Sequence, residues 1–537
     1  MHTHFYRVIF ISCLLLVSVF SLEGQENRIA IDSISIQQDS NKVEILGSDR
    51  LTLLKVDDTT SIQILAGRVR LRQGKALFNC DSCVLNNSEN IFEAWRNVQI
   101  KDGDSIQVNA RHLLYKIDKK IAYLDGGVTL SDRKAILSTP SLEYNLNTDI
   151  GIYTNGGKVV NKKTTLTSKE GYYYASLKEI YFKNDVKLND PGYKITTDSL
   201  LYNTATQTNR FIAKTTIIDS SGRRIETKDG YYKGGKAEFN QRPTIIDGST
   251  TITGDRIAFD DSTGTSQAIG NVVVVDTAQG TTLVTGQLFR QDNEERMLAT
   301  GKPLLIFKQE KDSLYLTADT IFTAMQPNAV KKDTSLLKNT TRISVSKKDS
   351  TLRYVEAFHH VKIFSDSLQA VCDSLYYSDK DSIFRLFRDP VLWSKENQIT
   401  GDTIWLYTKN KKSDRLTVFE NSMIISQVDT GIYNQVGSIR MEGRFTDGNL
   451  DSLRAFGNAE TIYFLQDEDS TYTGINESKS DLIDIYFSIQ ALERIVLRGA
   501  VSGTVWPIQQ KNPAEMKLPL FKWNDLRRPK SRLDLLQ

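Results

Sequence analysis

The sequence predicts an all-β protein, built as an elongated stack of short antiparallel bent strands. Three observations predict this fold class. A pattern of apolar side chains recurs about every 29 residues, from before Cys80 to beyond Tyr407. Within each copy, apolar and polar residues alternate as they do in a strand with one buried face, and no helical periodicity interrupts the repeats. Turn-forming sequences separate the alternating stretches.

The repeating unit is clearest in Tyr193–Asn203, which reads YKITTDSLLYN. Asp198 marks its centre. An apolar residue stands three positions before the centre, and apolar or aromatic residues stand two and four positions after it. The centres of the successive copies are Asp81, Arg111, Pro140, Lys169, Asp198, Lys228, Asp255, Gly286, Asp319, Asp373 and Asp402.

The apolar residue before each centre has the wrong parity for a straight strand, because side chains in a strand alternate between two faces. The chain must therefore bend or bulge at the centre. Asp, Ser and Thr suit such a corner because their side chains can bond nearby backbone amides. We interpret the repeated Asp, as at Asp198, as a structural corner residue and not as a catalytic group.

A second apolar stretch recurs between the centres, as in Val98–Ile100 and Val272–Val274. Turn-forming pairs such as Arg96-Asn97 and Gly270-Asn271 come directly before it. Each period should therefore supply two or three short strands. One period alone has too few apolar residues to form a stable core, so neighbouring copies are expected to stack.

The N-terminal residues 1–24 are predicted to be a signal peptide. Arg7 precedes an apolar run, Val8–Phe20, and a short polar stretch follows it. The run is too short for a comfortable membrane span. We therefore expect an exported, periplasmic protein, with a possible association with the outer membrane.

The remaining chain divides into four parts. Repeats occupy 25–323 and 351–505, and an insertion loop rich in lysine and aspartate separates them at 324–350. The last segment, 506–537, holds four of the ten prolines. We expect this tail to cap the array; the alternative is that it docks a partner.

The composition argues against several classes of function. The chain has 68 basic and 65 acidic residues, so no strong field of one sign suggests a nucleic-acid partner. No nucleophile elbow, phosphate-binding glycine loop, zinc spacing or calcium loop is present. Cys80 and Cys83 have the spacing of a redox motif, but in a straight strand they would face opposite sides, about 10 Å apart. We expect no enzyme activity, no cofactor and no metal site.

The repeats resemble the OstA-like (LptA) family of periplasmic lipopolysaccharide-transport proteins. The residues that carry the resemblance are the paired units Gly270–Val272 and Ile195–Tyr202, with Ser249–Ile257 as the closest single copy. The pattern covers residues 45–465. The resemblance implies a twisted β-jellyroll, repeated two to three times, whose apolar interior carries lipid acyl chains. It brings no catalytic residues.

A stack of bent strands with one apolar face would form a long groove, and such a groove could shelter acyl chains from water. We expect the inward apolar residues of the repeats to line it. The candidate lipid-binding residues are Val98, Ile100, Leu113, Tyr115, Val128, Leu130, Val186, Leu188, Leu200, Tyr202, Ile257, Phe259, Val272 and Val274. The other interpretation of the same residues is that they fill a closed core.

The expected ligand is lipopolysaccharide, held by its lipid A portion. The strands at the two ends of the stack would have unpaired backbone groups, which invite strand addition. They could pair with inner- and outer-membrane components of lipopolysaccharide transport, or with a second copy in a head-to-tail arrangement.

Two alternative functions remain open at this point. An outer-membrane β-barrel also fits a period of about 29 residues, although its strands need about 9–11 residues of sustained alternation. A secreted β-solenoid that acts on or binds polysaccharide is the second alternative. It should show a cleft of converging carboxylates or a calcium site.

Overall fold

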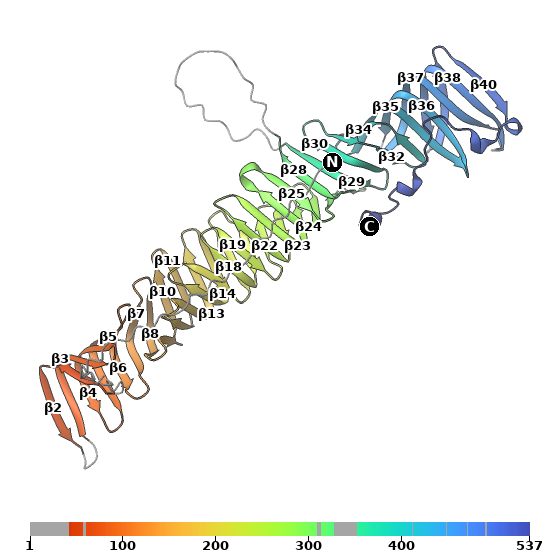
Figure 1. Cartoon of the computed structure of the whole chain (residues 1–537). Coiled ribbons are helices and arrows are strands. Elements are labelled where there is room, and N and C mark those ends of the chain that lie inside the picture. The colour runs from red at the N-terminus through yellow and green to blue at the C-terminus, as the bar shows by residue number, and fades with distance from the viewer. Residues whose placement is uncertain are drawn as a thin grey trace, which may run out of the picture.

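The computed structural model describes residues 42–56, 61–308, 313–326, 352–410, 412–446, 448–469, 471–488 and 491–536. Within these ranges the strands join in one 40-stranded sheet, and neighbouring strands pair in antiparallel fashion. Figure 1 shows an elongated molecule along which the strands advance from β2 at one end to β40 at the other. The predicted all-β stack is confirmed.

The strands of the N-terminal part are β1 (Glu44–Gly47), β2 (Arg50–Lys55), β3 (Ser61–Gln73), β4 (Ala76–Asn86), β5 (Ile91–Asp102), β6 (Ile106–Lys116), β7 (Ile121–Ser131), β8 (Ile136–Asn145), β9 (Ile150–Tyr153), β10 (Gly157–Asn161), β11 (Thr164–Ser168), β12 (Glu170–Tyr174), β13 (Glu179–Asp190) and β14 (Tyr193–Asn203). The middle strands are β15 (Thr208–Phe211), β16 (Thr215–Asp219), β17 (Arg224–Thr227), β18 (Asp229–Lys233), β19 (Lys236–Asn240), β20 (Thr244–Asp247), β21 (Thr250–Thr253), β22 (Arg256–Asp260), β23 (Thr265–Asp276), β24 (Thr281–Gln291), β25 (Arg296–Thr300), β26 (Leu304–Phe307), β27 (Leu314–Thr317) and β28 (Thr320–Met325).

The C-terminal strands are β29 (Arg353–Phe364), β30 (Gln369–Ser378), β31 (Ile383–Phe387), β32 (Val391–Ser394), β33 (Asn397–Thr400), β34 (Thr403–Lys409), β35 (Lys412–Asp429), β36 (Ile432–Thr446), β37 (Asn449–Gln466), β38 (Tyr472–Ser488), β39 (Ala491–Arg498) and β40 (Ser502–Pro507). The helical elements are single 3₁₀ turns: η1 (Asp292–Glu294), η2 (Ile508–Gln510), η3 (Pro513–Glu515), η4 (Asp525–Arg527) and η5 (Arg532–Leu535). Among the described residues, none of the helices has the length and apolar character to cross a membrane.

The long strands bend where the repeat changes parity. In β5, Arg96 and Asn97 have φ angles of 61° and 49°, and the pairing register with β4 and β6 shifts across them. Two such residues form a bulge, which kinks a strand. The predicted turn at Arg96-Asn97 is therefore wrong in detail, because the pair lies inside one strand of 12 residues.

The repeated Asp lies at the corner, opposite the bulge of the neighbouring strand. The side-chain amide of Asn97 donates to Asp81 at 2.9 Å, and that of Asn271 donates to Asp255 at 2.8 Å. The structural role expected for this Asp is therefore borne out. Its partner differs from the expected one, since it is a side-chain amide on the next strand and not a nearby backbone amide.

The residue before the centre stabilises the corner through hydrogen bonds from its inward side chain to backbone carbonyls. The Thr197 hydroxyl donates toward the Ser199 carbonyl oxygen at 3.2 Å and the Lys214 carbonyl oxygen at 3.1 Å. The same bond to the carbonyl two positions on is made by Thr139, Ser168, Thr227 and Thr285. These positions carry Thr or Ser because each buried corner carbonyl needs a hydrogen-bond donor.

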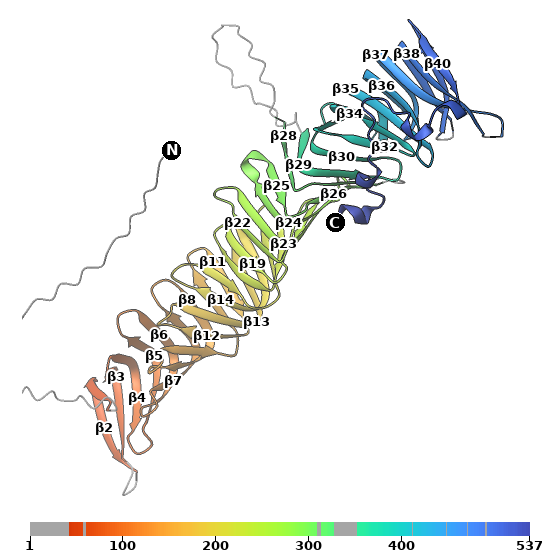
Figure 2. The same cartoon turned by 45° about the vertical axis from the view of Figure 1, so that its right-hand side comes forward.

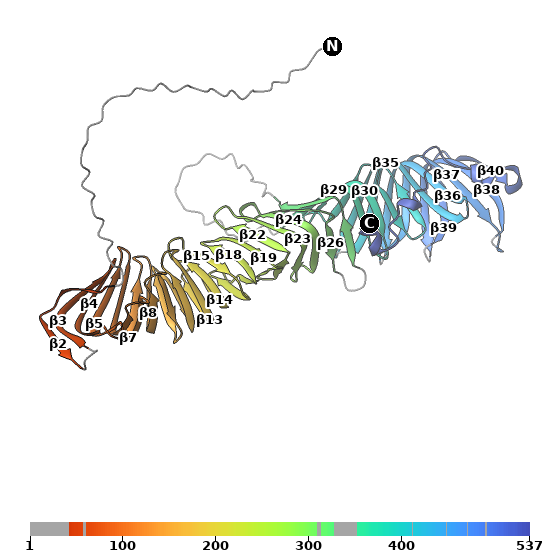
Figure 3. The ribbon, with the colours of Figure 1, turned by 60° about the horizontal axis from the view of Figure 1, so that its bottom comes forward.

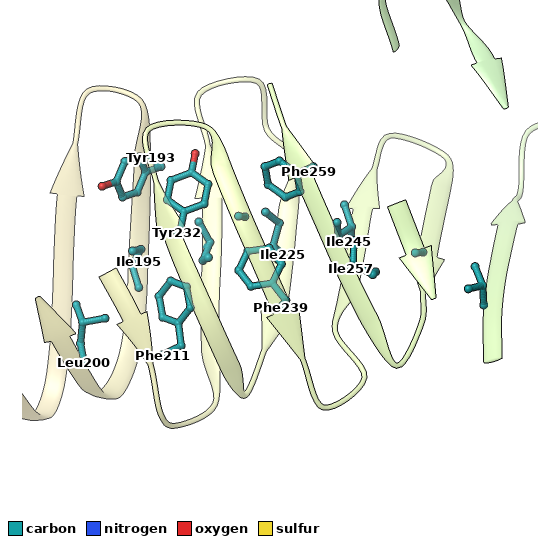
Figure 4. Close-up of a cluster of buried hydrophobic side chains, with 14 of the residues drawn as sticks. Tyr193, Ile195, Leu200, Phe211, Ile225, Tyr232, Phe239, Ile245, Ile257 and Phe259 are labelled. Atoms are coloured by element: carbon teal, nitrogen blue, oxygen red, sulfur yellow. The ribbon is translucent and has the colours of Figure 1, made fainter. Parts of the chain in front are cut away.

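The bends fold each period over, so that two layers of strand halves face each other across one interior. One hydrophobic cluster runs through this interior from Leu65 to Phe487. Figure 3 shows the strands as successive rungs along the whole molecule, and Figure 4 shows Phe211, Phe239 and Ile257 between the two layers.

Cys80 and Cys83 lie on either side of the bend in β4 and are both buried and free. The expectation that they face opposite sides is wrong, because the bend between them turns both side chains inward. The contact with Cys80, together with burial, raises the pKa of the Cys83 thiol, which keeps it protonated and unreactive.

The C-terminal tail runs back along the side of the stack, so the expectation that it caps the end is wrong. The amide of Gln435 on β36 donates to the Met516 carbonyl at 2.9 Å and accepts from the Leu518 amide at 2.9 Å. Gln398 on β33 makes the equivalent pair of bonds to Lys522 and Asn524. In Figure 2 the dark blue tail ends beside β29 and β30.

The tail lies there because the outer face beneath it is apolar. A second hydrophobic cluster lies there, formed by Met423, Ile425, Ile462, Phe464 and Ile475 and completed by Leu518 of the tail.

The predicted signal peptide at 1–24 lies outside the described residues. So does the predicted insertion at 324–350, except for residues 324–326.

Candidate functional site

The candidate lipid-binding residues all lie in the interior between the two layers. Their exposed fractions range from 0% to 8%, and all fourteen belong to the main hydrophobic cluster. The structure thus brings the predicted residues together along one continuous apolar interior, filled by side chains. Figure 4 shows this packing for Leu200, Ile257 and Phe259.

The hairpin turns between strands form two rims, one along each free edge of the folded-over layers. Rim A consists of turns such as 74–75, 103–105 and 132–135, and rim B consists of turns such as 117–120 and 146–149. Both rims lie opposite the line of corners. Their contact decides whether the interior is open or closed on that side.

A row of tyrosines lies just inside rim B. Its members recur at the repeat spacing and are buried; they are Tyr115, Tyr144, Tyr173, Tyr202 and Tyr232. The repeat pattern predicts Tyr115 and Tyr202 as inward residues, but not the polar contacts that this row makes. The recurrence of an aromatic residue four positions after each centre was the signal that could have identified it.

A row of polar side chains lies opposite, just inside rim A, and it was missed altogether. The Tyr144 hydroxyl donates to the Asp102 carboxylate at 2.9 Å, and the Tyr115 hydroxyl donates to Gln73. Thr204 of rim B donates to Asp132 at 2.8 Å. We call this line of contacts between the rims the polar seam.

Further contacts extend the polar seam in both directions. Near its start, Lys75 forms an ion pair with Asp149 at 3.2 Å across the rims. At its far end, Arg223 of rim A contacts Asp261 of rim B at 3.0 Å. The polar seam therefore closes the interior from Gln73 to Asp261.

The pKa values of the two buried acids of the seam are shifted in opposite directions. Burial raises the pKa of Asp102, because the hydrogen bond from Tyr144 and the nearby Lys75 ammonium offset it only in part. Burial would raise the pKa of Asp132 as well, but the nearby Tyr173 hydroxyl, the hydrogen bond from the Thr204 hydroxyl and those from the Lys134 and Ala135 backbone amides outweigh it and lower the pKa. The two acids are therefore expected to make the stability of the seam depend on pH.

Beyond Asp261 the interior opens into a cleft of about 470 Å³. Apolar side chains of the inward face form its floor, including Ile252, Val274, Leu283, Met297, Leu305 and Val355. Charged residues stand at its margin, including Asp276, Arg290, Asp292, Glu295, Arg296 and Arg353. No contact between the rims closes this part of the described chain.

The two ends of the sheet carry strands with one unpaired edge within the described residues. At the N-terminal end, every residue of β2 is exposed, and Leu53 is exposed to 71%. β1 and β2 pair only with β3 in the described part of the chain, and β40 pairs there only with β38. Both ends can accept a further strand.

The two adjacent histidines of the chain have a structural role, and the described residues hold no candidate metal site. No group of three or more His, Cys, Asp or Glu side chains there could hold a metal ion. His359 and His360 occupy a bulge, where they contact Asp373 at 3.0 Å and Asp319 at 2.8 Å. These histidines therefore take the corner role that Asn97 and Asn271 take in other repeats.

Comparison with known proteins finds a family match in the first part of the chain. Residues 40–198 match the family model described as OstA-like protein. This match confirms the resemblance to the OstA-like family and coincides with the first part of the polar seam.

Among solved structures, the chain is similar to LptH of Pseudomonas aeruginosa, described as the LptA homologous periplasmic component of the conserved lipopolysaccharide transport device. The sequence identity is 14%, the match covers 26% of this chain and 95% of LptH, and the TM-score is 0.21. No curated protein matches the chain.

Proposed function

We propose that the protein is a periplasmic lipid carrier, and not an enzyme, that shelters the acyl chains of lipopolysaccharide in its interior on the way to the outer membrane. The observation that carries this proposal is the single apolar interior that continues from Leu65 to Phe487. The OstA-like match over residues 40–198 supports the same function.

Carriage in this interior requires the two layers to part, because side chains fill the space between them. The layers are joined covalently at the corners, whereas polar contacts join the rims. Each buried CH₂ group of an acyl chain contributes about 0.8 kcal/mol, and this gain can offset the loss of several rim contacts. Similar apolar surfaces in successive repeats would let a chain move along without entering water.

The two ends of the sheet would join the carrier to its partners. The exposed edge of β2 carries Leu51, Leu53 and Leu54, all more than 45% exposed. Strand addition there, and at β40, would extend the interior into transport components at the inner and outer membranes, or into a second copy. Export by a cleaved signal peptide would place the protein between the two membranes.

Photo-crosslinking in cells tests the proposal. A photoreactive amino acid at Leu188 or Val274, both inward, should give adducts with lipopolysaccharide. The matched control is Lys187, whose side chain is on the exposed face of the same strand as Leu188. Absence of adducts at Leu188, Val274 and the neighbouring inward positions would exclude the carrier function.

A further inference from the structure

The cleft at β21–β30 differs from the interior behind the polar seam in one respect. Its apolar floor is exposed to solvent between the two rims. Upstream, Tyr144 and Tyr202 are fully buried behind the polar seam. In the cleft, Ile252, Met297 and Leu305 keep partial exposure although they pack against the same core. Among the described residues, the interior is therefore accessible here without any contact between the rims being broken.

The two rims approach each other on both sides of the cleft. On the N-terminal side, Arg223 bridges Asp261 across the rims and stacks over the Phe259 ring at 4.5 Å. On the C-terminal side, the rim B turn at Gly448 approaches rim A, since a Cβ added at Gly448 would lie 3.7 Å from the Ser367 hydroxyl oxygen. The opening is thus a local feature of the chain between them.

Guanidinium groups at the margin are already paired with carboxylates of the same rim. Arg290 contacts Asp292 at 2.6 Å, and Arg353 contacts Glu295 at 3.7 Å. Such pairs keep the margin polar and hydrated while the floor stays apolar. This arrangement suits an amphiphile whose acyl chain lies on the floor and whose head group remains in water.

We propose that this cleft is a lateral portal, through which an acyl-chain amphiphile enters or leaves the interior between its two ends. The proposal rests on the carrier function and adds a route to it. The polar seam upstream keeps the amphiphile inside once it has moved toward the N-terminal repeats.

The test uses the purified full chain and a lysophospholipid probe with a diazirine in its acyl chain. Photoreaction at intervals after mixing reports where the probe has arrived. Adducts at Leu283, on the portal floor, should precede adducts both at Leu188, behind the seam, and at Val418, an inward residue toward the C-terminal end. Simultaneous appearance at Leu283 and either other position, or earlier appearance at Leu188 or Val418, would overturn the portal.

A second experiment places a charge on the portal floor. Met297→Arg should slow loading at Leu188 by about tenfold or more, because an acyl chain must then pass a partly buried cation on the apolar floor. Leu298→Arg is the matched control, since Leu298 is the next residue of β25 and is exposed on the outer face. Its loading rate should equal that of the unmodified chain.

The outcomes separate the two proposals. Equal loading rates for Met297→Arg and Leu298→Arg, with Leu188 still labelled, would overturn the portal but keep the carrier function. No adduct at Leu188 or any other inward position of the unmodified chain would overturn the carrier function itself. The time order in the unmodified chain decides the portal even where Met297→Arg fails to fold.

Discussion

The hydroxyl of Tyr144 donates a 2.9 Å hydrogen bond to the buried carboxylate of Asp102, 42 residues earlier in the chain. The two residues come from opposite rims, so the bond joins the free edges of the two layers. Tyr115 and Gln73 repeat the relationship one period earlier, also 42 residues apart. Because both pairs have the same offset, the contact depends on how neighbouring periods align in the stack, and not on the sequence next to either residue.

Tyr144→Phe should destabilise the N-terminal repeats by about 1–3 kcal/mol, because Asp102 keeps its buried position but loses its donor. Urea unfolding followed by fluorescence measures the change. Tyr231→Phe is the control, since Tyr231 is 43% exposed. Equal losses in the two variants would mean that the Tyr144 bond contributes nothing specific.

Thr197→Val should cost about 1–3 kcal/mol, because the corner carbonyls of Ser199 and Lys214 lose their buried donor. Thr196→Val, on the exposed face of the same strand, should leave the urea midpoint nearly unchanged. A larger effect of Asp198→Asn than of Thr197→Val would mean that the Asp, and not the Thr, contributes most to the stability of the corner.

The lowered pKa of Asp132 predicts a loss of stability in acid. A carboxylate with a depressed folded-state pKa contributes stability above its unfolded pKa, about 3.9, and this contribution disappears as the pH falls through the folded-state pKa. Asp132→Asn should therefore reduce stability at pH 7 and lose its effect in acid, as measured by urea midpoints over a pH series.

Asp102 should give the opposite slope, because its folded-state pKa is raised. Its contribution to stability falls as the pH rises above the unfolded pKa of about 3.9. Asp102→Asn should remove that fall and flatten the pH dependence. Parallel slopes for the Asp102 and Asp132 variants would contradict the two assigned directions.

Gly171→Ala should destabilise the fold by about 1–3 kcal/mol through overpacking. Gly171 stands where other repeats have an apolar side chain, and a Cβ there would lie 2.3 Å from the Tyr153 ring. Combining it with Tyr153→Ala should relieve the clash, so a double-mutant cycle that shows strict additivity would contradict this explanation.

Removal of residues 508–537 should expose the apolar side face formed by Met423, Ile425, Ile462, Phe464 and Ile475. We expect increased binding of a hydrophobic dye and self-association in analytical ultracentrifugation. Arg527→Ala is the control, because it removes only a surface ion pair with Asp389. A monomeric truncated chain without extra dye binding would show that the tail covers nothing essential.

Much of the fold could be predicted because it depends on local pattern. Alternation around Asp198 predicts strands, and the parity change in Tyr193–Asn203 predicts a bend, since a side chain's face follows from its position in the strand. The same reasoning correctly selected inward residues such as Val98 and Leu188. It could not distinguish a turn from a bulge at Arg96-Asn97, because both need the same backbone conformations.

The sequence by itself therefore determined the repeat, the bent strands and the apolar face that each repeat presents. Only the tertiary structure decided what meets across the interior: Asp102 with Tyr144, Asp132 with Thr204, and the tail with Gln398 and Gln435. The reason is physical. Periodicity records which side of a strand is buried, whereas contacts between the rims depend on how neighbouring periods stack and twist.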